Sequence, residues 1–74
     1  MLTEEQVKAA MRAAGVSADI DAIGLNDKFS ESGLDSLDVF NLLIELQADT
    51  GQQVPDKDVP LLESIAAIIN YFKP

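Results

Sequence analysis

Apolar side chains recur at helical spacing in three separate segments, and this periodicity constrains the fold more than any other feature. The segments cover residues 3–14, 36–50 and 64–72. Spacings of three, four and seven residues place apolar side chains on one face of a helix, whereas a half-buried strand needs strict alternation. Because no segment alternates in that way, the sequence predicts an all-α fold.

Local signals mark the ends of the first helix. Thr3 and Gln6 have the spacing of a capping box, and Leu2 and Val7 have that of a hydrophobic staple. Gly15 follows the last apolar residue, where a left-handed conformation often ends a helix. A helix over residues 3–14 is therefore expected.

The segment over residues 36–50 is apolar around more than half of its circumference. Its large apolar side chains are Leu37, Val39, Phe40, Leu42, Leu43, Ile44 and Leu46. We expect residues 37, 40, 43 and 44 to form one stripe, which the other three widen. This girth predicts that the helix, which ends at Gly51, is the central element and touches other helices on several sides.

A long loop separates the first two helices. Residues 16–34 keep no regular period, and a loop of that length in so short a chain is usually functional. The segment 17–23 allows one short helical turn. Its expected anchors in the core are Ile20, Ile23, Leu25 and Phe29.

The second connector is predicted to hold a short helix. Pro55 suits the start of a helix over residues 56–59, and Pro60 is expected to stop it. Ser64 is a good N-cap for the last helix. The sequence thus predicts one domain over residues 1–74, a small antiparallel bundle of three main helices plus one short helix.

The composition excludes several functions. The 74 residues include no His and no Cys, so a Ser-His-Asp or Cys-His hydrolase and an ordinary zinc site are impossible within this chain. There are 13 Asp and Glu against 5 Lys and Arg, a net charge of −8. That sign disfavours nucleic acid and anionic membranes and favours basic protein partners.

The hydropathy pattern favours a soluble protein. No apolar stretch reaches the roughly 18 residues that a membrane span requires. The first five residues lack the basic and apolar regions of a secretory signal. A cytoplasmic monomer is the expectation.

The acidic loop invites a calcium interpretation, which the spacing does not support. Residues 27–38 have the length of an EF-hand loop, but Phe29 takes the third position and Gly33 falls at the seventh instead of the sixth. The pairs Asp19/Asp21 and Asp56/Asp58 suit only loose binding of divalent ions. No metal site is predicted.

Ser36 is the residue most open to a chemical role. It stands at the predicted start of the second helix, where a serine is common simply because it caps helices. Asp35 and Asp38 flank it, and no base near it in sequence would activate its hydroxyl. The long loop and Gly33 lead directly to it. Such a serine is poorly placed to attack a substrate and well placed to be modified by another enzyme.

The chain resembles the acyl carrier protein family, whose signature is Asp-Ser-Leu at the start of the second helix. Residues 33–38 read Gly-Leu-Asp-Ser-Leu-Asp. Residues 29–33 look like the family's preceding loop, residues 54–56 like the entry to its third helix, and residues 68–71 like its fourth helix. The resemblance extends over nearly the whole chain and implies an acyl-carrier-like bundle.

The resemblance implies a carrier and not an enzyme. In the family, the serine matching Ser36 receives 4'-phosphopantetheine from coenzyme A through a phosphopantetheinyl transferase. The thiol of that arm holds acyl or aminoacyl groups as thioesters. The expected partners are this transferase and acyl-transferring, condensing or ligase enzymes of fatty acid, lipid or secondary-metabolite biosynthesis. The family also shelters acyl chains in the bundle, whereas Leu42, Leu43 and Leu46 suit a plain core equally well.

The resemblance also implies contact residues for those partners. Asp35 and Asp38 match positions that meet basic side chains, and Leu37 and Ile44 match positions of apolar contact. Asp56, at the matching entry to the third helix, is a further expected contact.

The chain departs from the family pattern at several positions. Asn41, Gln47 and Ala48 are uncharged where acids are frequent, and Thr50 replaces a bulky apolar residue. Pro60 and Leu61 stand where charged residues often continue the third helix. Two alternatives therefore stay open: a specialised aminoacyl or polyketide-type carrier that serves a dedicated ligase, and an acidic helical adaptor that is never modified.

Overall fold

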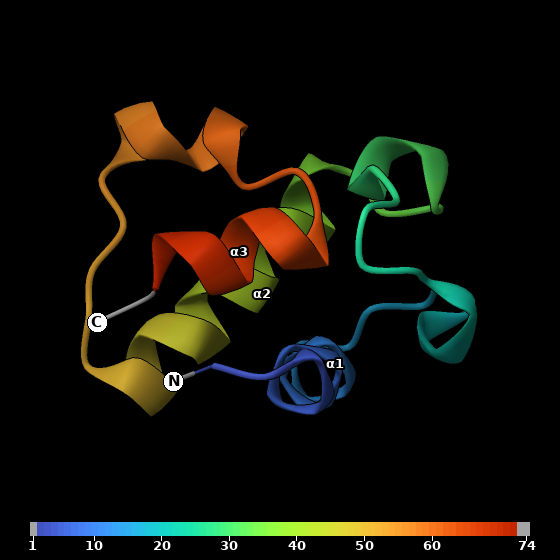
Figure 1. Ribbon diagram of the computed structural model, residues 1–74, viewed down its shortest axis with the longest axis horizontal. Helices are drawn as coiled ribbons and strands as arrows, with labels where there is room; N and C mark the ends of the chain where they lie inside the picture. Colours follow the sequence, from blue (N-terminus) through green and yellow to red (C-terminus); the bar gives the residue numbers. More distant parts are fainter. Residues whose placement is uncertain (1, 73–74) are drawn as a thin grey trace.

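The computed structural model describes residues 2–72, and all its regular structure is helical (Figure 1). The elements are α1 (Glu4–Ala13), η1 (Ile20–Ala22), η2 (Phe29–Glu31), α2 (Ser36–Thr50), η3 (Asp56–Leu61) and α3 (Ile65–Tyr71), where η denotes a 3-10 helix. Within residues 2–72 there is no β-strand. The expected all-α bundle is confirmed.

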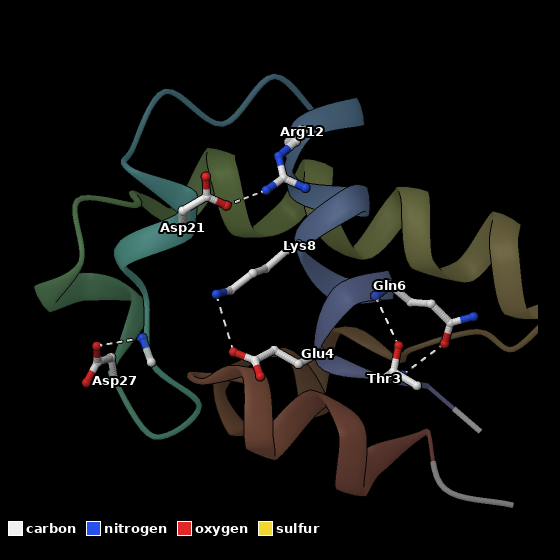
Figure 2. A network of polar contacts seen from close by, with 8 residues as sticks. Thr3, Glu4, Gln6, Lys8, Arg12, Asp21 and Asp27 are labelled. Carbon is white, nitrogen blue, oxygen red and sulfur yellow. Dashed lines mark hydrogen bonds and ion pairs between the residues drawn. The ribbon is translucent and has the colours of Figure 1, made fainter.

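The predicted caps of α1 are present. The backbone N–H of Gln6 donates to Oγ1 of Thr3 at 3.2 Å, and the backbone N–H of Thr3 donates to Oε1 of Gln6 at 2.9 Å (Figure 2). Leu2 and Val7 are both buried, as a hydrophobic staple requires. Gly15 has a φ of 78°, the left-handed conformation expected after the last turn.

α1 is the helix that lies against both of the others. It contacts α2, α3 and η1, and in Figure 1 it is seen along its axis. The helix over residues 36–50, expected to be the central element, packs against α1 and buries only one of its apolar faces. The helical residues of the core are Val7, Ala10, Met11, Leu42, Leu43, Leu46, Ile65 and Ile68.

The long loop is fixed by three of the four predicted anchors. Ile20, Ile23 and Phe29 are buried, whereas Leu25 is 42% exposed. The backbone of Leu25 holds the loop instead, because its carbonyl accepts a hydrogen bond from the N–H of Ala66 at 2.9 Å. This bond satisfies one of the unpaired N–H groups in the first turn of α3.

A second backbone bond joins the same segments. The N–H of Phe29 donates to the carbonyl of Glu63 at 2.8 Å, just before α3 begins. The helical turn allowed within residues 17–23 is η1, whereas η2 was not expected. Its three residues are too few to show a period in the sequence.

The second connector forms η3, which continues through Pro60 to Leu61. The prediction that Pro60 stops this helix is therefore wrong. The fixed φ of proline suits a 3-10 turn, so the residue costs only the bond that its missing N–H would have made. Ser64 caps α3 as expected, accepting from the N–H of Ala67 at 3.1 Å. None of the helices over residues 2–72 is both long and apolar enough to cross a membrane.

Candidate functional site

Ser36 is the first residue of α2, and its side chain is exposed. Asp35, one residue earlier, is the N-cap, with φ −94° and ψ −178°. The alternative in which Ser36 is present because it caps the helix is therefore wrong. Its hydroxyl stands at the tip of α2, beside the residues that perform the capping.

Asp35 and Asp38 form a capping box that holds the first turn of α2. The N–H of Asp38 donates to Oδ1 of Asp35 at 2.8 Å, and the N–H of Asp35 donates to Oδ2 of Asp38 at 3.3 Å. These bonds satisfy N–H groups that no carbonyl within the helix can reach. Both carboxylates therefore fix the backbone around Ser36 and also leave negative charge at its sides.

The segment before Ser36 is held by one buried aromatic residue. Phe29 is 2% exposed, and its carbonyl accepts hydrogen bonds from the N–H groups of Ser32 and Leu34 at 3.0 and 3.1 Å. Between them, Gly33 has a φ of 94°, a conformation that other residues rarely adopt. The loop thus turns sharply just before Ser36, which lies at the surface.

A groove of about 380 Å³ opens beside Ser36. It lies between η2, the first turn of α2 and the end of η3. Most of its wall is apolar, and its lining residues are Phe29, Ser30, Leu34, Asp35, Ser36, Val39, Val59, Pro60, Leu62 and Glu63. Ser36 therefore stands at the rim of a mostly apolar depression.

The predicted contact residues fall on two elements. Leu37 and Ile44 lie on α2 and are 63% and 47% exposed. Asp35 and Asp38 flank Ser36 in the same helical turn. Asp56 is exposed at the start of η3, and the structure therefore does not place it on the helix that carries the others.

Phe40 belongs to the apolar stripe expected along the second helix, and it lies at the surface. Its side chain is 52% exposed, and Leu37 and Ile44 are exposed as well, while Leu43 is buried. Of the stripe predicted over residues 37, 40, 43 and 44, only Leu43 is buried. A helix that is apolar on two sides gives no signal in its spacing about which side packs inward.

Two of the departures from the family pattern have structural roles. The side-chain amide of Gln47 donates to the carbonyl of Leu43 at 3.1 Å and accepts from the N–H of Val54 at 2.9 Å. Thr50 donates from its hydroxyl to the carbonyl of Leu46 at 2.7 Å. Gln47 thus ties the connector that follows α2 to the helix.

Two acidic residues of the loop are engaged in local contacts. Oδ2 of Asp27 accepts from the N–H of Gly24 at 2.8 Å, and Asp21 pairs with Arg12 (Figure 2). In α1, Nζ of Lys8 lies 3.3 Å from Oε2 of Glu4, one helical turn away (Figure 2). Within residues 2–72, no three His, Cys, Asp or Glu side chains gather where they would hold a metal ion.

Comparisons with known proteins agree with the geometry of this site. A family model described as "Phosphopantetheine attachment site" matches residues 6–72. The acyl carrier protein of Campylobacter jejuni subsp. doylei is 38% identical over 72 residues, which cover 96% of this chain and 92% of that protein. A second one, from Campylobacter jejuni subsp. jejuni (strain 81-176), is 36% identical over the same length.

A more distant relative matches less of the chain. The acyl carrier protein of Rickettsia bellii (strain RML369-C) is 31% identical over 55 residues, 73% of this chain. The resemblance seen around Ser36 is confirmed by these matches, which extend over nearly all the elements described above. The chain belongs to the acyl carrier protein family, and it is a non-catalytic carrier that takes a covalently bound 4'-phosphopantetheine.

Proposed function

We propose that Ser36 carries the 4'-phosphopantetheine. The observation that supports this most directly is the division of roles at the start of α2, where Asp35 and Asp38 do the capping. The Ser36 hydroxyl is exposed and one residue past the cap. It fits the group because a second enzyme can approach it without disturbing the helix.

The attachment is a phosphoryl transfer in which the chain supplies the nucleophile. Oγ of Ser36 forms a bond to the β-phosphorus of coenzyme A, and the bond from that phosphorus to the bridging oxygen breaks. Adenosine 3',5'-bisphosphate leaves, and the hydroxyl proton passes to a base of the transferase. The chain has no His, and the groups flanking Ser36 are carboxylates held in hydrogen bonds, so the base must come from the transferase.

The bound group would bring to this site a thiol on a flexible arm, which holds acyl groups as thioesters. The chain itself has no Cys, so the thiol comes only from the 4'-phosphopantetheine. Beside Ser36, the groove of about 380 Å³ has apolar walls from Leu34, Val39 and Val59. Those walls suit part of an apolar acyl chain.

The partners proposed for this carrier are the transferase and acyl-transferring, condensing or ligase enzymes of fatty acid, lipid or secondary-metabolite biosynthesis. Asp35, Asp38 and Asp56 suit basic side chains on such enzymes, and a net charge of −8 favours their approach. Three further statements stay predictions from the sequence: that the protein is cytoplasmic, that it is a monomer, and that residues 1–74 form one domain.

Intact mass spectrometry tests the role of Ser36. The purified chain is incubated with coenzyme A and a broad-specificity phosphopantetheinyl transferase. We expect one added phosphopantetheine on the unaltered chain and none on Ser36→Ala. Ser17→Ala is the matched control, because Ser17 is an exposed serine outside the site and its loss should leave the mass gain intact.

Two results would contradict the proposal. One is a chain that gains no mass, as an unmodified adaptor would behave. The other is a mass gain that survives Ser36→Ala, which would place the group elsewhere. The pathway is tested separately by the mass of the species attached to the protein from its native source, since a fatty acyl and an aminoacyl cargo differ in mass.

A further inference from the structure

A second pocket opens at the end of the bundle away from Ser36. Its volume is about 580 Å³, and its lining residues are Leu2, Gln6, Ala9, Leu46, Asp49, Thr50, Gln52 and Phe72. We call it the distal pocket. The ends of α2 and α3 and the segment before α1 meet there, on one side of the bundle in Figure 1. Thr50 lies about 20 Å along α2 from Ser36, at a rise of about 1.5 Å per residue. The distal pocket and the groove beside Ser36 share no lining residue.

The floor of the distal pocket is apolar. Leu2, Leu46 and Phe72 line it and are 8%, 1% and 4% exposed. Sites for small molecules are hollows of about 300–1,000 Å³ with apolar walls and a few polar groups. The distal pocket, at about 580 Å³, falls within that range. It therefore has the size and the floor for a small molecule with an apolar part.

The rim of the pocket is polar, and two of its side chains already have partners. The side-chain oxygens of Gln6 and Thr50 accept hydrogen bonds from backbone N–H groups at 2.9 and 3.2 Å. Asp49 is exposed, and within residues 2–72 its carboxylate makes neither a hydrogen bond nor an ion pair. Its negative charge is therefore open to a ligand.

The end of α2 adds to this negative charge. The N–H of Gly51 donates to the carbonyl of Gln47 at 2.9 Å, and the carbonyls of residues 48–50 have no later N–H in the helix to meet. They form the negative end of the helix dipole. The last turn of α2 has no basic residue, and no Lys or Arg from residues 2–72 lines the pocket. A cation suits this rim, whereas one carboxylate does not suit Ca²⁺, which takes about six to eight oxygen ligands.

We propose that the distal pocket is a second binding site and that its ligand is a small alkylammonium ion. The alkyl chain lies on the apolar floor, and the ammonium group meets Asp49 and the carbonyls at the end of α2. Such a ligand buries its carbons and keeps its charge at the wet rim, so no charged group is buried without a partner. The site goes beyond the proposed function and does not depend on it.

The test is a titration of the isotope-labelled chain with n-hexylammonium chloride, followed by the NMR shifts of its backbone amides. We expect saturable shifts at Gln6, Ala9 and Thr50 and none at Ser36. The neutral n-hexanol should bind about two- to fivefold more weakly, because it lacks the ion pair with an exposed carboxylate. n-Butylammonium should bind more weakly by up to about fourfold for each CH₂ that it lacks. Sodium chloride at the same ionic strength should give no saturable shift.

Two pairs of variants locate the site. Asp49→Asn should weaken the binding of n-hexylammonium about two- to fivefold, whereas Asp19→Asn removes an equal charge outside the pocket and should leave it unchanged. Ala9→Leu fills part of the pocket and should weaken binding about fivefold or more. Ala13→Leu is its matched control, because Ala13 is exposed in the same helix outside the lining. Leu suits a helix nearly as well as Ala, so both variants should fold.

Other outcomes would overturn the proposal. Shifts that do not saturate, or that spread over the acids of the whole chain, would mean only a general attraction to the net charge of −8. Equal binding of n-hexanol, or unchanged binding to Ala9→Leu, would remove the ion pair or the pocket from the account. Binding that appears only in Lys73→Gln would make a lysine of the chain itself the occupant. Tighter binding of Nα-acetyl-lysine methylamide than of n-butylammonium would make it a lysine of a partner protein. None of these results would affect the mass gain expected on Ser36.

Discussion

The hydroxyl of Tyr71 donates a hydrogen bond to Oδ2 of Asp58 at 2.7 Å, which joins the end of α3 to η3. No residue of η3 is fully buried, although Val59 packs against the core. Val59 and Pro60 of η3 also form one wall of the groove beside Ser36. The bond between Tyr71 and Asp58 therefore ties η3, and with it this wall, to the end of α3.

Replacing Tyr71 by Phe should loosen η3 while leaving the bundle folded. The substitution removes the hydroxyl and keeps the ring, which meets the ring of Phe72 edge-on at 5.4 Å. We expect faster hydrogen exchange at the amides of Asp58 and Leu62, which close the turns of η3, and unchanged exchange in α1. Equal exchange in both proteins at Asp58 and Leu62 would show that η3 is held by other contacts.

The same bond predicts a change in stability at high pH. The hydrogen bond to Asp58, followed by partial burial and the negative charge of that carboxylate, raises the pKa of Tyr71 above its ordinary value of 10.0. The protonated hydroxyl is favoured in the folded state, so its contribution is complete below pH 10.0 and is lost as the pH rises through the raised pKa.

Urea unfolding at a series of pH values measures this loss. The free energy of unfolding of the unaltered chain should fall toward that of Tyr71→Phe above pH 10.0. Tyr71→Phe serves as the control, because it differs from the unaltered chain only by the hydroxyl that makes this bond. A difference between the two proteins that stayed constant above that pH would contradict the account.

The two functions of Asp35 can be separated by substitution. Asp35→Ala removes the N-cap of α2 and should cost about 1 kcal/mol of stability. Asp35→Asn keeps an oxygen that accepts from the N–H of Asp38 and should cost much less. Thermal unfolding and transferase kinetics of both variants make the comparison. A slower modification of Asp35→Asn at unchanged stability would assign its charge to the partner, whereas equal destabilisation of both variants would refute the capping role.

The ends of α1 and α3 were predictable from the sequence because they depend on local interactions. The side chains of Thr3 and Ser64 each accept from an N–H group three residues away, so short motifs define these caps. The position of Leu25 depends on a bond between its carbonyl and Ala66, which lies far along the chain. No local pattern encodes such a contact, which is why that side chain was wrongly assigned to the core.

The candidate site was likewise predictable from the sequence only in part. Ser36 and its flanking aspartates were identifiable from six consecutive residues, since the cap and the family motif coincide there. The exposure of Phe40 was not, because α2 is apolar on two sides and only its packing against α1 decides which side is buried. The groove was not predictable either, since Val59 comes to Phe29 only through the fold.

Asp49 is expected to weaken α2 through its charge. It is exposed in the last turn of a helix that has no basic residue there, and a negative charge at that end opposes the helix dipole. Asp49→Asn should therefore stabilise the chain by about 0.3–1 kcal/mol at low salt. The gain should shrink as salt is added, because screening weakens interactions of exposed charges. A gain that did not depend on salt would point to a cause other than charge.

The whole chain should respond to salt in the same direction. The chain has a net charge of −8, and its structure extends over 27 × 23 × 21 Å, a few Debye lengths of about 10 Å at 0.1 M salt. Self-repulsion of the folded state should be relieved as sodium chloride rises from about 0.01 M to about 0.1 M. The melting temperature should therefore increase over that range. A constant or falling melting temperature would show that repulsion does not limit stability.

Phe29→Ala and Phe40→Ala should differ strongly in their effect on the free energy of unfolding. Phe29 is 2% exposed and anchors the loop before Ser36, so Phe29→Ala should cost about 3–5 kcal/mol. A chain of 74 residues has only roughly 4–11 kcal/mol in total, so this variant should be largely destabilised. Phe40 is 52% exposed, and Phe40→Ala should change the free energy of unfolding by less than about 0.5 kcal/mol. Urea unfolding measures the free energy of unfolding of both variants. A large decrease for Phe40→Ala would mean that the Phe40 side chain packs within the protein and is not an exposed contact.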